Sequence, residues 1–82
     1  MELTREEFLN EYWEGIKGLC VEYDKDFNKV VGNNAYLCKK GVYNPTVIKE
    51  RQMAKNLGIA YSTFLIKLSY QLPWEGLKWI FG

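Results

Sequence analysis

The chain has 82 residues, of which 48% are hydrophobic and 16% aromatic, and its formal net charge is +1. This composition suits one globular domain over residues 1–82 and argues against disorder, while no apolar run approaches the roughly 18 residues of a membrane-spanning helix. Histidine is absent and cysteine occurs only twice, so the sequence predicts no metal site, no cofactor and no enzymatic activity.

The first predicted element is an amphipathic helix over about residues 5–30. Thr4 and Glu7 have the spacing of a capping box. Apolar residues then recur every three or four positions: Phe8, Tyr12, Ile16, Leu19, Tyr23, Phe27 and Val30. Gly15 and Gly18 each cost about 1 kcal/mol relative to alanine, so they either admit a second helix closely or mark a bend near Gly18. The N-terminal helical segment is expected to end by residue 31, before Gly32-Asn33-Asn34.

The polar side of this first helix is acidic. Its carboxylates are Glu6, Glu7, Glu11, Glu14, Glu22, Asp24 and Asp26. Residues 1–44 carry six Lys or Arg and eight Asp or Glu, whereas residues 45–82 carry five and two. A solvated helix face explains the acids most simply; the alternative is a surface that mimics DNA or docks a basic protein groove.

Two cysteines, Cys20 and Cys38, stand 18 positions apart. The start of the chain, MELTREEF, lacks the apolar core of a secretion signal, which predicts a cytoplasmic protein. Because disulfides are rare in that compartment, we expect both thiols to behave as small buried hydrophobes, with a disulfide as the alternative.

The segment at residues 35–43 is ambiguous. Ala35 to Cys38 and Val42-Tyr43 could form a short β-hairpin around Lys39-Lys40-Gly41. The same residues could equally form a loop that is packed by its aromatic side chains.

The second half is predicted to contain two helices and an apolar tail. Asn44 is a candidate cap with Pro45 at the first helical position, which gives a helix over residues 46–56. A turn at residues 57–59 leads to a helix over residues 61–71. The tail, PWEGLKWIFG, is apolar enough to dock on the core. The fold class is therefore mainly α.

The two helices of the second half have the spacing of a helix-turn-helix over residues 45–82. Such a motif needs a small residue where the helices cross and a left-handed residue in the turn. Ala54 and Gly58 fill those positions. The apolar residues available to fill the wedge between the helices are Met53, Leu57, Ile59, Phe64 and Leu68.

Within residues 46–80 the stretch AKNLGIAYSTFLIKLSYQLPWEGLKWI, which begins at Ala54, resembles small helix-turn-helix proteins of phages and mobile elements. Their pattern is approximately A-x-x-L-G-I-S-x-S-T-L-x-x-R-L-x-x-G-W-x-x-E-A-L, and Lys67 replaces its arginine. The resemblance implies a regulator or DNA-handling factor whose second helix enters the major groove of double-stranded DNA. We expect the protein to bind DNA as a dimer, in a regulatory role. The residues expected to contact DNA are Tyr61, Ser62, Thr63 and Lys67 in the groove, with Lys55 and Arg51 on phosphates.

One departure from this pattern favours an alternative function. Leu65 and Ile66 are adjacent, so at least one of them faces away from the core, and an apolar exposed helix face often marks a protein contact. The alternative is a protein-binding inhibitor of a host nuclease or defence system, similar to an anti-CRISPR protein, on the same scaffold. Its interface residues would be Leu65, Ile66, Tyr70, Glu7, Glu11 and Glu14.

Overall fold

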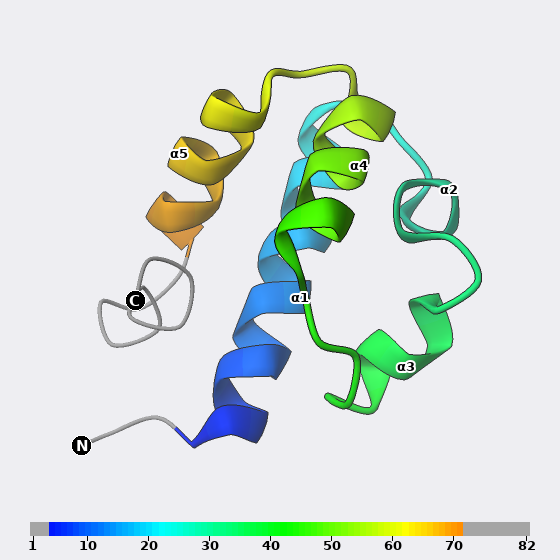
Figure 1. Cartoon of the computed structure of the whole chain (residues 1–82), viewed down its shortest axis with the longest axis vertical. Coiled ribbons are helices and arrows are strands. Elements are labelled where there is room, and N and C mark those ends of the chain that lie inside the picture. Colours follow the sequence, from blue (N-terminus) through cyan, green and yellow to red (C-terminus); the bar gives the residue numbers. More distant parts are fainter. Residues whose placement is uncertain (1–3, 72–82) are drawn as a thin grey trace.

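The computed structural model describes residues 4–71, and within them the chain forms helices joined by short connections, with no strand (Figure 1). The helices are α1 (Arg5–Glu22), α2 (Phe27–Val31), α3 (Ala35–Lys39), α4 (Val47–Leu57) and α5 (Tyr61–Gln71). The mainly α fold class predicted from the sequence is confirmed. The predicted docking of the tail falls on residues 72–82, outside the described part of the chain.

Helix α1 begins as its sequence predicts and ends earlier. The Thr4 hydroxyl accepts a hydrogen bond from the Glu7 amide at 3.1 Å, and the Glu7 carboxylate accepts one from the Thr4 amide at 3.1 Å, which completes the capping box. The predicted helix over residues 5–30 is broken after Glu22, where Asp24 adopts a left-handed φ of 53°. Asp26 then caps α2 by accepting a hydrogen bond from the Asn28 amide at 3.4 Å. A bend at Gly18 is not observed, because that residue lies inside α1.

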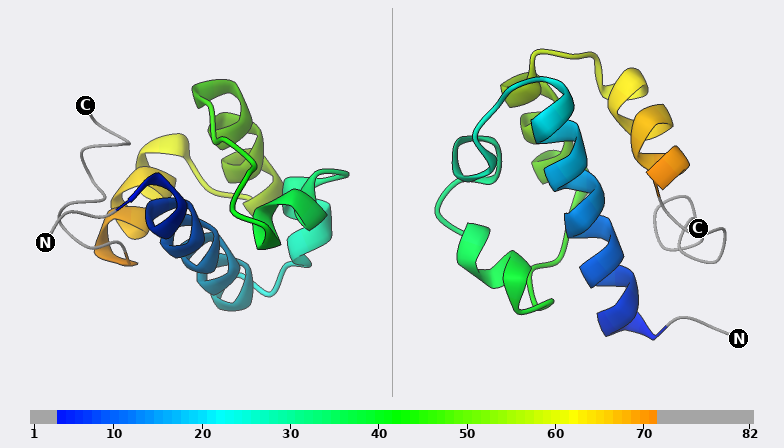
Figure 2. Two further views of the ribbon diagram at one scale, coloured as in Figure 1. Left: turned by 90° about the horizontal axis from the view of Figure 1, so that it is seen from below. Right: turned by 180° about the vertical axis from the view of Figure 1, so that it is seen from behind.

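The two glycines of α1 face helix α5. This agrees with the prediction that they let a second helix approach closely. A Cβ atom built on Gly15 would lie 3.0 Å from Leu68 Cδ1, and one built on Gly18 would lie 2.5 Å from Gln71 Oε1. Both views of Figure 2 show α5 lying along α1. The missing side chains therefore let these two helices approach closely.

We expect Gly18→Ala and Gly15→Ala to affect stability differently. At Gly18 the new Cβ meets the far end of the exposed Gln71 side chain, which can rotate away, so the gain in helix propensity raises the free energy of unfolding by up to about 1 kcal/mol. At Gly15 it meets Leu68, which is fully buried and cannot move aside. Urea unfolding of both variants checks this, and an equal gain at the two positions would contradict it.

Residues 35–43 form neither the hairpin nor the loop that the sequence suggested. Ala35 to Lys39 is a short helix, α3, followed by Gly41 at a φ of 67°. Ala35 and Cys38 are both buried, and their spacing of three places them on one side of a helix. A hairpin would have turned every second side chain to the same face, and no neighbouring strand is present within residues 4–71 to pair with it.

Helices α4 and α5 match the predicted helix-turn-helix segment, with small shifts at the ends. Thr46, and not Asn44, caps α4, since its hydroxyl accepts a hydrogen bond from the Lys49 amide at 3.2 Å. The Asn44 side chain instead accepts a hydrogen bond from the Arg5 guanidinium. Gly58 ends α4 in the left-handed conformation at a φ of 81°, and the turn to α5 spans residues 58–60.

The hydrophobic core lies between α1 and the other four helices. Its buried members are Phe8, Leu9, Tyr12, Trp13, Ile16, Leu19, Cys20, Val30, Cys38, Met53, Ala54, Leu57, Phe64 and Leu68. Both cysteines are buried and unpaired, so the interpretation as small hydrophobes is confirmed. Burial raises the pKa of Cys20, and it raises that of Cys38 to about 11, which keeps both thiols protonated at neutral pH. No helix within residues 4–71 has the length and apolar character needed to cross a membrane.

Candidate nucleic-acid interface

A short turn with two backbone hydrogen bonds joins α4 to α5. The Gly58 amide donates to the Lys55 carbonyl and the Ile59 amide donates to the Ala54 carbonyl, both at 3.0 Å. Figure 1 shows the two helices meeting at this turn and diverging from it. Fully buried Phe64 and Leu68 hold α5 on the core, so its opposite side is fixed in orientation and exposed.

A buried carboxylate, which the sequence reasoning missed, connects α1, α4 and α5. Glu50 is 6% exposed and accepts hydrogen bonds from the hydroxyls of Tyr12 at 2.8 Å and Tyr61 at 3.4 Å. Burial raises the pKa of Glu50, although both hydrogen bonds oppose that shift. Its place three and four residues before buried Met53 and Ala54 is the signal in the sequence that could have revealed it.

The raised pKa of Glu50 predicts a specific dependence of stability on pH. The folded state holds this proton more tightly than the unfolded state, so the contribution of Glu50 is most favourable below the ordinary carboxyl pKa. It is lost as pH rises from that ordinary value through the raised folded-state pKa. We therefore expect Glu50→Gln, which cannot ionise, to gain stability relative to wild type between pH 4 and pH 7. Chemical unfolding at several pH values measures this difference, with exposed Glu11→Gln as the control; a difference that falls with pH would contradict the assignment.

Tyr61, one of the residues expected to contact DNA, interacts with other side chains of the protein. Besides the hydrogen bond to Glu50, its ring stacks on Phe64 with centroids 6.3 Å apart. The Arg51 guanidinium lies 5.3 Å from the centroid of the Tyr61 ring. Burial, followed by the Glu50 charge, raises the pKa of Tyr61, so the hydroxyl remains a donor. Tyr61 therefore positions α5 on α4, and only its half-exposed ring edge is open to a partner.

Lys67 is also engaged within the protein. Its ammonium group lies 2.5 Å from Glu22 Oε2 at the end of α1 and 5.4 Å from the centroid of the Tyr23 ring. The hydrogen bond to Glu22 is the main cause of a raised Lys67 pKa. Because Lys67 is the sole cation of α5, the part of that helix expected to enter a groove carries no unpaired positive charge.

The remaining predicted contacts are open to a partner. Arg51 and Lys55 are exposed, four residues apart on α4, and form no ion pair within the described part of the chain. Ser62 is exposed and Thr63 half-buried, and neither hydroxyl has a hydrogen-bond partner among residues 4–71. Within residues 47–71 the sole acidic residue is the buried Glu50. The outer surface of α4 and α5 therefore has cations and no exposed carboxylate.

The outward side of α5 is partly apolar. Leu65 is half-buried against the core, whereas Ile66 and Tyr70 are 55% and 83% exposed. The adjacent pair Leu65-Ile66 is thus divided between core and surface. Ser62, Ile66 and Tyr70 follow one another at intervals of four, so they share one side of the helix.

The acidic residues of the alternative interface are exposed on α1, and Glu7 and Glu14 already have partners within the protein. Glu7 belongs to the capping box, and its hydrogen bonds to Thr4 lower its pKa. Glu14 pairs with Lys17 at 3.2 Å. Glu11 is exposed. Among the described residues no group of acidic and cysteine side chains is arranged to hold a metal ion.

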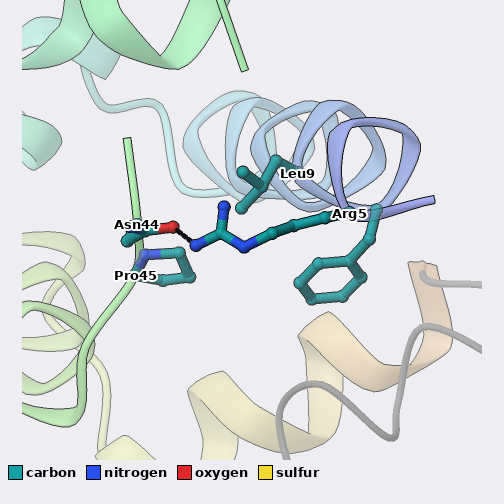
Figure 3. Close-up of a pocket in the computed structure, with 5 residues that line it drawn as sticks. Arg5, Leu9, Asn44 and Pro45 are labelled. Atoms are coloured by element: carbon teal, nitrogen blue, oxygen red, sulfur yellow. Dashed lines mark hydrogen bonds between the residues drawn. The ribbon is translucent and has the colours of Figure 1, made fainter. Parts of the chain in front are cut away.

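A cavity of about 120 Å³ lies between the start of α1 and the segment before α4. Figure 3 shows the Arg5 side chain lying along it and reaching Asn44, with Leu9 and Pro45 as neighbours. Among the described residues that line this cavity, Arg5 and Asn44 are the polar side chains, and the Arg5 guanidinium donates to Asn44.

Comparison with protein-family models, with curated proteins and with solved structures finds no match to this chain. The resemblance of residues 46–80 to phage helix-turn-helix proteins therefore remains a prediction.

Proposed function

We propose that this protein binds double-stranded DNA through α4 and α5, in a regulatory role. The observation that carries the proposal is the charge of this surface: Arg51 and Lys55 are exposed and form no ion pair within residues 4–71, although Arg51 lies over the Tyr61 ring. No exposed carboxylate accompanies them on either helix. DNA affinity rests largely on cations that neutralise phosphates. The exposed acids lie on α1 and its following turn, and Glu22 among them pairs with Lys67 of α5. Helix α4 therefore suits a polyanion better than α1 does.

In this proposal the N-terminal part of α5 enters the major groove. Ser62 and Thr63 lie in its first turn, where the recognition helix of a helix-turn-helix contacts base edges. Arg51 and Lys55, on the preceding helix, bind phosphates beside the groove. Tyr61 and Lys67 hold α5 in place through Glu50 and Glu22. A dimer would present two such helices about 34 Å apart, one turn of the double helix.

Charge reversal tests the assigned phosphate contacts. We expect Arg51→Glu combined with Lys55→Glu to weaken binding to random-sequence duplex DNA on the order of tenfold or more, and to reduce the salt dependence of the affinity by about one unit of slope for each cation. The matched control is Lys39→Glu with Lys40→Glu, which makes the same charge change at exposed positions on α3 and its cap. Fluorescence anisotropy measures both variants, and an equal loss in the two would contradict the proposed surface.

A second candidate function, binding to a protein such as a host nuclease, is favoured by the exposed apolar pair Ile66 and Tyr70. Two large apolar side chains at one helix face are typical of a protein contact. The two candidates predict different responses: Tyr70→Ala would disrupt a protein interface and leave DNA binding unchanged, because Tyr70 lies at the far end of α5 from the first turn.

A further inference from the structure

We propose that α5 recognises thymine through its 5-methyl group, with Ile66 as the contacting side chain; this inference rests on the proposed DNA-binding function. The methyl group is the apolar feature that thymine presents in the major groove, and apolar side chains distinguish thymine by contact with it. The same group on 5-methylcytosine has the same chemistry. Base recognition by α5 depends on which of its side chains are free to meet a base edge.

Ile66 occupies the position from which a base can be reached. It lies four residues, or about one helical turn, after Ser62 on the same side of α5. Its side chain is 55% exposed, while Phe64 and Leu68 on the opposite side are fully buried. When the first turn of α5 enters a groove, Ile66 is the next side chain on that face to meet the bases.

The side chains that usually read guanine or adenine are not available on this face. Guanine is read by Arg or Lys and adenine by Asn or Gln. The sole Lys of α5, Lys67, is paired with Glu22. Gln71 is the last residue of the helix, and its carboxamide lies against Gly18 of α1. The Ser69 hydroxyl donates to the Ile66 carbonyl at 2.6 Å and is therefore also engaged.

What remains in the first two turns of the groove-facing side is the hydroxyls of Ser62 and Thr63 and the apolar side chain of Ile66, with Tyr70 one turn further along. Ser62 and Thr63 can bond to several bases and so discriminate weakly. Ile66 offers no hydrogen bond, and placing it against the polar edge of guanine or cytosine leaves those groups unsatisfied. Against a methyl group it buries apolar area on both partners. The exposed cations Arg51 and Lys55 on α4, a helix with no exposed carboxylate, favour DNA rather than an apolar protein as the occupant. The exposed acid Glu22, which lies beside α5, is paired with Lys67.

The test compares duplexes that differ only in the methyl group. The probe is the duplex selected for highest affinity from a random-sequence pool, prepared in one form with thymine and in another with uracil. Burying one methyl group corresponds to an affinity ratio of about three- to fourfold. Wild type is expected to prefer the thymine form by about that ratio for each methyl contacted. Ile66→Ala is expected to bind both forms equally, and Tyr70→Ala to keep the wild-type preference.

The Ile66→Ala variant and a duplex with 5-methylcytosine separate methyl contact from other effects on affinity. Loss of methyl groups also changes DNA shape, but an effect of shape would persist in Ile66→Ala. If the preference for thymine disappears in Ile66→Ala, the preference therefore comes from contact with this side chain. Cytosine replaced by 5-methylcytosine shows whether the methyl group or thymine itself is read. Equal binding of thymine and uracil duplexes by wild type, with salt-dependent affinity intact, would overturn the inference and leave the proposed function standing. Absence of any DNA binding would overturn both.

Discussion

Replacing Phe64 with alanine is expected to lower the free energy of unfolding by about 3–5 kcal/mol, the range for removing a large aromatic side chain from a core. Phe64 is fully buried in the hydrophobic core, and its ring stacks on Tyr61. A domain of this size has a total stability on the order of 5–10 kcal/mol, so the variant would be close to unfolded. Urea unfolding followed by circular dichroism measures the change.

Ile66→Ala on the same helix is the matched control for this prediction. Its side chain is 55% exposed, so its loss should change stability by less than about 1 kcal/mol. Equal effects at Phe64 and Ile66 would mean that α5 is not held on the core by the face assigned here. The control also shows that the variant used to test thymine recognition keeps its fold.

Tyr12→Phe is expected to produce the second largest loss of stability. The Tyr12 hydroxyl is fully buried and donates to the Glu50 carboxylate at 2.8 Å. Removing a hydrogen bond to a charged, buried group costs about 1.5–3 kcal/mol. Because this bond lowers the pKa of Glu50, its loss should raise that pKa further. The stability deficit of the variant should therefore be larger at pH 7 than at pH 4, which chemical unfolding at the two pH values measures.

Tyr36→Phe provides the control for Tyr12→Phe. Tyr36 is 60% exposed, so the same atomic change there should leave stability within about 0.5 kcal/mol of wild type. If Tyr12→Phe were as mild as Tyr36→Phe, or if its deficit did not grow with pH, the Glu50 carboxylate would not depend on Tyr12 as the geometry indicates.

Local signals in the sequence predicted the parts of the fold that local interactions determine. The capping box of Thr4 and Glu7 and the left-handed Gly58 depend on neighbours in the chain, and both are confirmed. The break between α1 and α2 was harder to foresee, because the apolar period runs on through Tyr23 and Phe27. What interrupts the helix is the left-handed Asp24 followed by a new cap at Asp26. The apolar period continues across a change of chain direction, so periodicity alone could not locate it.

The candidate site was predictable only in outline. The order of α4, turn and α5 followed from the spacing of Ala54 and Gly58. The partners of two residues expected to contact DNA could not be predicted from the sequence. Lys67 pairs with Glu22, 45 residues away, and Tyr61 donates a hydrogen bond to the buried Glu50. A lysine on a predicted helix gives no sign of a distant partner. Such pairs become visible only once the helices are packed together.

A salt-dependent titration of the wild-type protein tests the claim that α4 and α5 form a DNA-binding surface. The protein is titrated onto fluorescein-labelled random-sequence duplex DNA at low and moderate salt, and the change in anisotropy is measured. With Arg51 and Lys55 as the phosphate contacts, the logarithm of the affinity should fall with the logarithm of salt concentration with a slope of about −2 for each protomer bound. Failure to bind at tens of micromolar protein and low salt would contradict the claim, and binding that is insensitive to salt would contradict it equally.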